Sequence, residues 1–215
     1  MDGLHLIAEP WWVNLLVLVP VVSFFLWRRK GLTLSWHQLL WLLLFGVAFG
    51  FVESAVVVYL RSGLALPDPP ASSQLQHYED FYQRAMSSLS LLPKKLITIE
   101  IAREACTMVM LVMVALLTGV RARERWAAFL WAFAAWDLTY YAGLWATLRW
   151  PSSLKDFDVL FLIPVPWVAQ VWFPVLVSGL ALVAVAITEK KQRSDEPAIN
   201  PPLSQAQTLQ DGPPV

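Results

Sequence analysis

The sequence is poor in charged side chains. Only 15% of its 215 residues are Asp, Glu, Lys or Arg, whereas 57% are hydrophobic, and a soluble domain usually carries about a quarter charged residues. Acidic and basic residues are equal in number, so the composition gives no support for nucleic-acid binding. These shortages are typical of a polytopic membrane protein, with the lipid bilayer as its first partner.

Cysteine and histidine are also scarce, and each scarcity excludes a kind of site. Cys106 is the single cysteine, so an intrachain disulfide cannot form. The histidines, His5, His37 and His77, lie near or beyond the ends of the apolar runs, which argues against a zinc site inside the membrane. The N-terminus is acidic and carries no basic leader. We therefore expect the first apolar run to be a retained anchor and not a cleaved signal peptide.

Five apolar runs are long enough to cross a hydrocarbon core of ~30 Å, which takes about 20 residues. They lie near 11–27, 36–60, 95–118, 126–148 and 160–188. The sequence thus predicts an all-α integral membrane protein, a bundle of about five transmembrane helices that forms one polytopic domain over residues 1–193. Residues 194–215, rich in Pro, Gln, Ser and Asp, are predicted to be a disordered tail.

The outer loop 62–93 is predicted to contain one more helix. Apolar residues recur at helical spacing in its second half, at Tyr78, Phe81, Tyr82, Ala85, Met86, Leu89 and Leu92. We interpret 77–90 as an amphipathic helix, either lying on the outer interface or packed on the bundle.

Prolines interrupt the start of the last apolar run. Pro164 and Pro166 remove backbone donors and disfavour helix in the residues before them. We expect 160–167 to be an extended lead-in to a helix that starts near Pro166.

Basic clusters predict the orientation of the chain. With five spans, three dense clusters fall on one side, at Arg28–Lys30, Arg121–Arg125 and Lys190–Arg193. Positive charge concentrates on the cytoplasmic side of membrane proteins. We expect a multi-pass protein of the cell (inner) membrane, with its N-terminus outside and its C-terminus in the cytoplasm.

Ionisable residues inside the apolar runs are the candidate site. These residues are Glu53, Glu100, Arg103, Glu104 and Asp137. Charges at membrane depth are costly and tend to mark function. Counted from the outer flanking charges, Glu53, Arg103 and Tyr140 all lie roughly 12 to 14 Å deep. We therefore expect Glu53, Glu100, Arg103, Glu104, Asp137 and Tyr140 to share one pocket nearer the outer leaflet, as candidate catalytic residues.

Four carboxylates and one arginine cannot all stay ionised in a low-dielectric interior. Either some acids are neutral, or a cation binds. A hard divalent cation, Mg, Mn or Ca, is one hypothesis, with Glu53, Glu100, Glu104 and Asp137 as its oxygen ligands. A purely structural hydrogen-bonded network is the other reading.

Three functions remain open at this point. The first is a membrane enzyme that acts on a lipid or another amphipathic substrate, with the acids as metal ligands or as acid and base. The second is a proton- or cation-coupled transporter, against which the apolar inner halves of the spans, 39–49 and 108–117, count. The third is an accessory or assembly protein with a structural polar network.

Overall fold

The computed structural model describes residues 8–64, 81–83, 87 and 93–194, with side chains up to residue 189 in the last helix. The protein is mostly helical, as predicted. In chain order the elements are β1 (Ala8–Glu9), the 3₁₀ helix η1 (Trp11–Val17), α1 (Leu18–Trp27), α2 (Trp36–Leu64), α4 (Lys94–Thr118), α5 (Ala122–Leu148), β2 (Phe157–Phe161), β3 (Trp167–Gln170) and α6 (Trp172–Ser194).

Among the described residues, three helices are long and apolar enough to cross a membrane: α2, α4 and α6. The first predicted run is a shorter apolar helix, Trp11–Trp27, made of η1 and α1. The fourth predicted run forms α5, which is not one of these three helices and is largely buried in the bundle.

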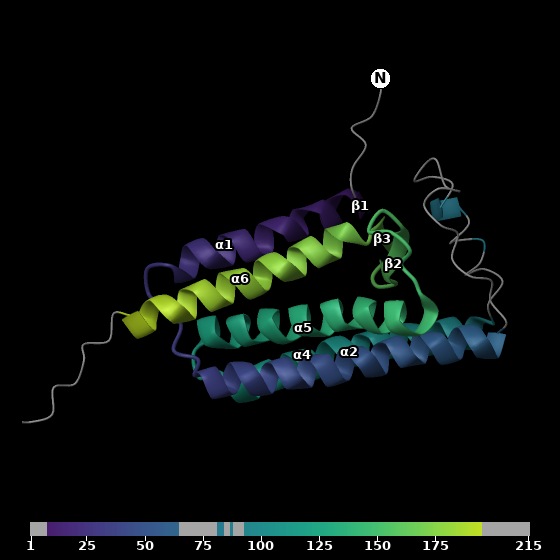
Figure 1. The fold of residues 1–215 in the computed structure, drawn as a ribbon. Coiled ribbons are helices and arrows are strands. Elements are labelled where there is room, and N and C mark those ends of the chain that lie inside the picture. Colours follow the sequence, from purple (N-terminus) through teal and green to yellow (C-terminus); the bar gives the residue numbers. More distant parts are fainter. Residues whose placement is uncertain (1–7, 65–80, 84–86, 88–92, 195–215) are drawn as a thin grey trace, which may run out of the picture.

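Helix α5 is the centre of the fold. It packs against α2, α4 and α6, while α1 packs on α6 (Figure 1). Its contact with α2 is close because glycines face it: a Cβ atom on Gly46 would lie 2.6 Å from that of Ala135, and Gly50 lies directly against the backbone of Trp136. Small residues of this kind let two helix backbones approach each other.

A small antiparallel sheet was not predicted. Strand β3 lies between β1 and β2, with Ala8 opposite Ala169 and Phe157 opposite Gln170. The segment that precedes the last helix is therefore extended, but α6 begins at Trp172 and not near Pro166. Pro174 fits the first turn of α6, where backbone N–H groups have no partner within the helix.

Most of the predicted helix 77–90 and all of the tail after residue 194 lie outside the described residues. Residues 81–83 and 87 are helical. Phe81 is buried and stacks on Phe157, with the ring centroids 5.3 Å apart. Phe81 thus packs against the sheet.

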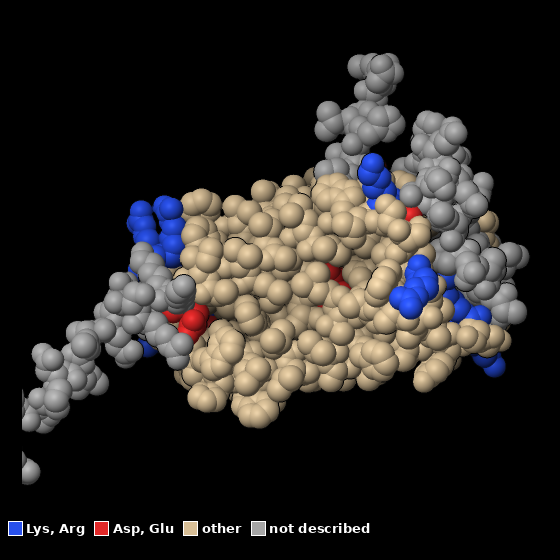
Figure 2. All heavy atoms as spheres, viewed as in Figure 1, with Lys and Arg blue, Asp and Glu red and all other residues tan. Residues whose placement is uncertain are grey.

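Charged side chains on the visible face lie mainly at the two ends of the bundle. Figure 2 shows a wide band with few charged side chains, which we call the apolar band, between a group of basic side chains where α1 and α6 end and another at the sheet end. Many large apolar side chains of the described helices are exposed, among them Leu117 at 87% and Leu26 at 70%. Exposure of this kind is what a surface covered by lipid requires.

Candidate functional site

A cavity of about 720 Å³ lies in the middle of the bundle, and we call it the central cavity. All of the residues singled out in the sequence line it: Glu53, Glu100, Arg103, Glu104, Asp137 and Tyr140. They come from α2, α4 and α5, three helices that are distant in sequence. The expectation that these groups share one pocket thus agrees with the structure, while their catalytic role stays a prediction.

Arg103 lies between two of the acids. Its Nη1 atom forms an ion pair with Glu53 on α2, and its Nη2 atom lies 2.7 Å from Oε2 of Glu100, one turn earlier on α4. Thr107 donates a hydrogen bond of 3.5 Å to the other oxygen of Glu53. One guanidinium group is therefore shared by two carboxylates and offsets one of their two negative charges, and Arg103 is not a free anchor for an anionic ligand.

Glu104 connects α4 to the segment after β2. Both of its carboxylate oxygens lie 2.9 Å from the backbone N–H of Leu162, which donates to them. Glu104 is 9% exposed. Its partner is thus a neutral peptide group of the chain.

Asp137 connects α5 to α6. The hydroxyl of Ser178 donates a hydrogen bond of 2.8 Å to its carboxylate, and both residues are buried. Ser178 was missed by the sequence reasoning because a serine in an apolar helix carries no distinguishing signal.

Asp158 on β2 is a further acid of the cavity, although its place just outside the last apolar run is typical of a solvated or capping residue. The hydroxyl of Tyr141 donates a hydrogen bond of 3.0 Å to it. Burial raises the pKa of the Asp158 carboxyl from 3.8 to about 6, against the opposing effects of that hydrogen bond and of Arg61. Asp156, by contrast, caps a turn: its carboxylate accepts the N–H groups of Ser152 and Ser153.

The polar groups occupy one end of the central cavity, and the other end is apolar. The lining of that apolar end includes Val19, Met108, Phe129 and Phe133. Trp126 and Tyr141 both line the cavity, and the helical rise separates them by roughly 22 Å along α5. The cavity is therefore long and amphipathic. In Figure 2, acidic atoms are visible at the bottom of a hollow in the apolar band.

The arrangement gives the metal hypothesis no support. Within the part of the chain that the structure describes, no three His, Cys, Asp or Glu side chains come together as a metal ion would require. Arg103 fills the space between Glu53 and Glu100, and Glu104 is bound to the backbone of Leu162. Each of these proposed ligands already has a partner within the protein.

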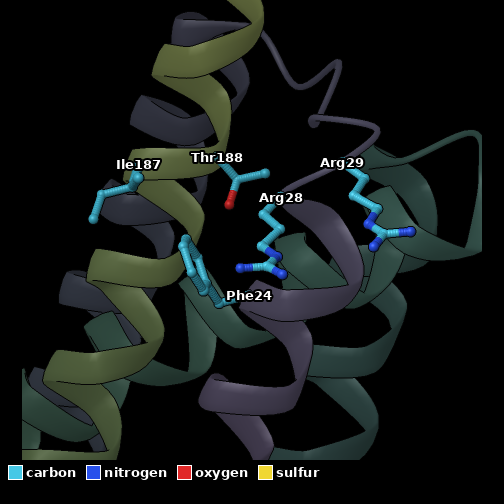
Figure 3. Close-up of a pocket in the computed structure, with 5 residues that line it drawn as sticks. All are labelled: Phe24, Arg28, Arg29, Ile187 and Thr188. Atoms are coloured by element: carbon cyan, nitrogen blue, oxygen red, sulfur yellow. The ribbon is translucent and has the colours of Figure 1, made fainter.

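A second cavity, of about 550 Å³, lies at the opposite end of the bundle between α1 and α6. In Figure 3, Arg28 extends between Phe24 and Thr188, while Arg29 points away from them. Arg28 also lies over the ring of Phe25, 4.7 Å from its centroid. These arginines belong to a basic helix end, and no acidic residue of the described chain lines this cavity.

Comparison of the chain with protein-family models, with curated proteins and with solved structures gives no match. Residues, cavity and charge are therefore the basis for any statement about function.

Proposed function

We propose that the chain is an integral membrane protein with five spans, formed by η1–α1, α2, α4, α5 and α6. The apolar band supports this proposal, as do the basic residues at both of its ends. Helix α5 is less apolar than the others, but α2, α4 and α6 surround it and shield it from lipid. One end of the bundle carries the dense basic clusters Arg28–Lys30 and Arg121–Arg125. Positive charge concentrates on the cytoplasmic side, so we assign this end to the cytoplasmic side of the inner membrane. The sheet and the polar end of the central cavity then lie toward the outside.

We infer that the protein is a membrane enzyme whose substrate is a lipid or another amphipathic molecule. The observation that carries this inference is the shape of the central cavity: acids and tyrosines line one end, and aromatic and aliphatic side chains line the other. Sites for small molecules are mostly apolar with a few convergent polar groups. The tail of such a substrate would lie along Phe129 and Phe133, with its head beside Asp137 and Tyr140.

The hydrogen bonds suggest different roles for the acids. Glu53, Glu100 and Glu104 are engaged by Arg103 and by the backbone of Leu162, so we assign them to shaping the site. Asp137 and Asp158 are bound by hydroxyl groups of Ser178 and Tyr141. A hydroxyl partner can itself donate or accept a proton, and we therefore propose these two acids for proton transfer to or from the substrate.

A structural network is the second candidate, and one observation favours it. Each hydrogen bond above joins two separate elements: Glu104 joins α4 to the segment after β2, and Asp137 joins α5 to α6. An accessory or assembly protein would need such links without any chemistry. The neutral variant D137N separates the two functions: loss of product formation in a folded protein supports the enzyme, whereas loss of thermal stability alone supports the network.

The proposal is tested on the full chain in a neutral detergent. Native mass spectrometry detects molecules that purify with the protein. V177F on α6 adds a ring to the lining of the cavity, beside Ser178, and V183F on the same helix adds the same ring on the outside, where Val183 is 53% exposed. We expect V177F to lose the bound molecule and V183F to keep it.

The enzyme reading is tested by incubating a membrane lipid extract with the wild-type protein and with D137N. Liquid chromatography with mass spectrometry should find a lipid that is converted only by the wild-type protein. Equal retention of ligands by V177F and V183F, together with an unchanged extract, would contradict the proposal.

A further inference from the structure

The polar end of the central cavity carries an excess of negative charge. Five carboxylates line it, from Glu53, Glu100, Glu104, Asp137 and Asp158, together with two guanidinium groups, from Arg61 and Arg103. The formal charge is therefore −3 when all of these groups are ionised. In a half-enclosed, low-dielectric cavity these groups cannot all stay ionised unless a cation binds, so the excess favours a cationic ligand over an anionic one.

The two arginines do not reverse this charge locally. Arg103 is shared by Glu53 and Glu100. Arg61 lies over the ring of Trp150, with its guanidinium carbon 5.9 Å from the ring centroid. Its positive charge also attracts the Asp158 carboxylate. Glu104 and Asp137 are hydrogen-bonded to a peptide N–H and a serine hydroxyl, both of them neutral donors.

Aromatic rings surround the same end of the cavity. The ring of Trp136 lies 6.4 Å from that of Tyr140 and 6.3 Å from that of Phe161, and Tyr140 lies 5.1 Å from Tyr141. All four residues line the cavity. Aromatic faces attract cations, and quaternary ammonium groups are commonly bound by several rings together.

The apolar end of the cavity determines which kind of tail the ligand carries. A small cation would leave the space beside Phe129 and Phe133 empty, whereas a long hydrocarbon tail would bury itself there. The excess of carboxylates would repel a phosphate or sulfate head group.

We propose that the central cavity binds an amphipathic molecule with a net positive alkylammonium head and a long apolar tail. The head lies among Asp137, Asp158 and the rings of Trp136 and Tyr140, and the tail lies along α5 toward Trp126. This inference rests on the proposed function, because it names the class of molecule that the same cavity takes.

The test compares amphiphiles that share one tail and differ in the head. The probes are hexadecyltrimethylammonium, hexadecylamine, hexadecanol and hexadecyl sulfate, each titrated into the full chain in a neutral detergent and followed by native mass spectrometry. We expect both ammonium probes to bind at least ~10-fold more tightly than the alcohol, a difference that a cation–aromatic contact and one carboxylate can supply. The sulfate should bind most weakly.

Matched variants assign the binding to the polar end. D137N and D158N each remove one negative charge from the cavity, and each should weaken ammonium binding severalfold while leaving hexadecanol binding unchanged. E124Q is the control, because Glu124 is also a buried acid of α5 but lies at the opposite end, outside the cavity. Size-exclusion chromatography checks folding, and D158N carries the test if D137N does not fold.

The possible results separate the two proposals. Equal binding of all four probes, or preference for the sulfate, overturns the cationic head but leaves an amphipathic ligand in the cavity. Binding that V177F does not reduce overturns both proposals, because the probe is then outside the cavity. Weaker ammonium binding in D158N but not in E124Q supports the inference.

Discussion

Both carboxylate oxygens of Glu104 lie 2.9 Å from the backbone nitrogen of Leu162. Leu162 directly follows β2, so a charged group on a long apolar helix holds the sheet against the bundle. Hydrogen bonds to charged groups contribute about 1.5–3 kcal/mol. This link fixes the wall of the central cavity where Asp158 lies.

Replacing Glu104 by Ala should therefore destabilise the protein. The N–H of Leu162 loses its acceptor in a partly buried place, and we expect the free energy of unfolding to fall by about 1–3 kcal/mol. E104Q keeps one acceptor oxygen and should lose less. Thermal unfolding in detergent measures both, with V109A as the control, since Val109 is 56% exposed on the same helix. Equal melting temperatures for E104A and V109A would contradict the prediction.

The ion pair of Arg103 with Glu53 should show strong coupling. R103Q leaves Glu53 buried without its cation, and breaking a buried pair on one side costs on the order of 3 kcal/mol. The double variant E53Q/R103Q removes both charges and should recover part of that loss. A double-mutant cycle on the unfolding free energies gives the coupling energy, and strictly additive effects would mean that the pair does not stabilise the fold.

The stability of the protein should depend on Asp158 in mildly acid solution. Burial is the main cause that raises the pKa of this carboxyl to about 6 from 3.8. The folded state then binds the proton more tightly than the unfolded state, so stability increases as the pH falls through 6 and levels off near 4. Wild type and D158N are compared by thermal unfolding between pH 7.5 and 4.5. The rise should be smaller in D158N and retained in E124Q.

The contact between α2 and α5 should tolerate no side chain at Gly50. A Cβ atom there would meet the backbone oxygen of Trp136 and lie 2.9 Å from Cβ of Thr139. G50A should cost about 1–3 kcal/mol because two backbones must move apart. A Cβ atom on Gly63, near the end of the same helix, would meet nothing within 4 Å among the described residues, so G63A should be neutral or slightly stabilising. Thermal unfolding of the two variants side by side checks the contrast.

Much of the candidate site followed from depth and helix face alone. Glu53, Glu104 and Asp137 were predicted together because an acid in an apolar helix stands out, and because the helical rise places Glu53, Arg103 and Tyr140 at a similar depth on the three helices. Asp158 was not predicted, because its position depends on the pairing of β2 with β3. That pairing, with β1 joined from the N-terminus, is a long-range contact that a local pattern does not encode. Because of the same hairpin, α6 begins at Trp172, after Pro164 and Pro166.

Transport of protons is the alternative that the cavity lining argues against most directly. Toward the cytoplasmic side of the proposed orientation, Trp126, Phe129 and Phe133 line the cavity, and its described lining contains no titratable side chain there. A proton or cation on this route would cross an apolar stretch, which is costly at membrane depth. Liposomes that hold the protein and an internal pH-sensitive dye should therefore collapse a pH gradient no faster than liposomes without it. Proton flux that requires the protein and disappears in D137N would show a path that these side chains do not provide, and would favour transport over an enzyme.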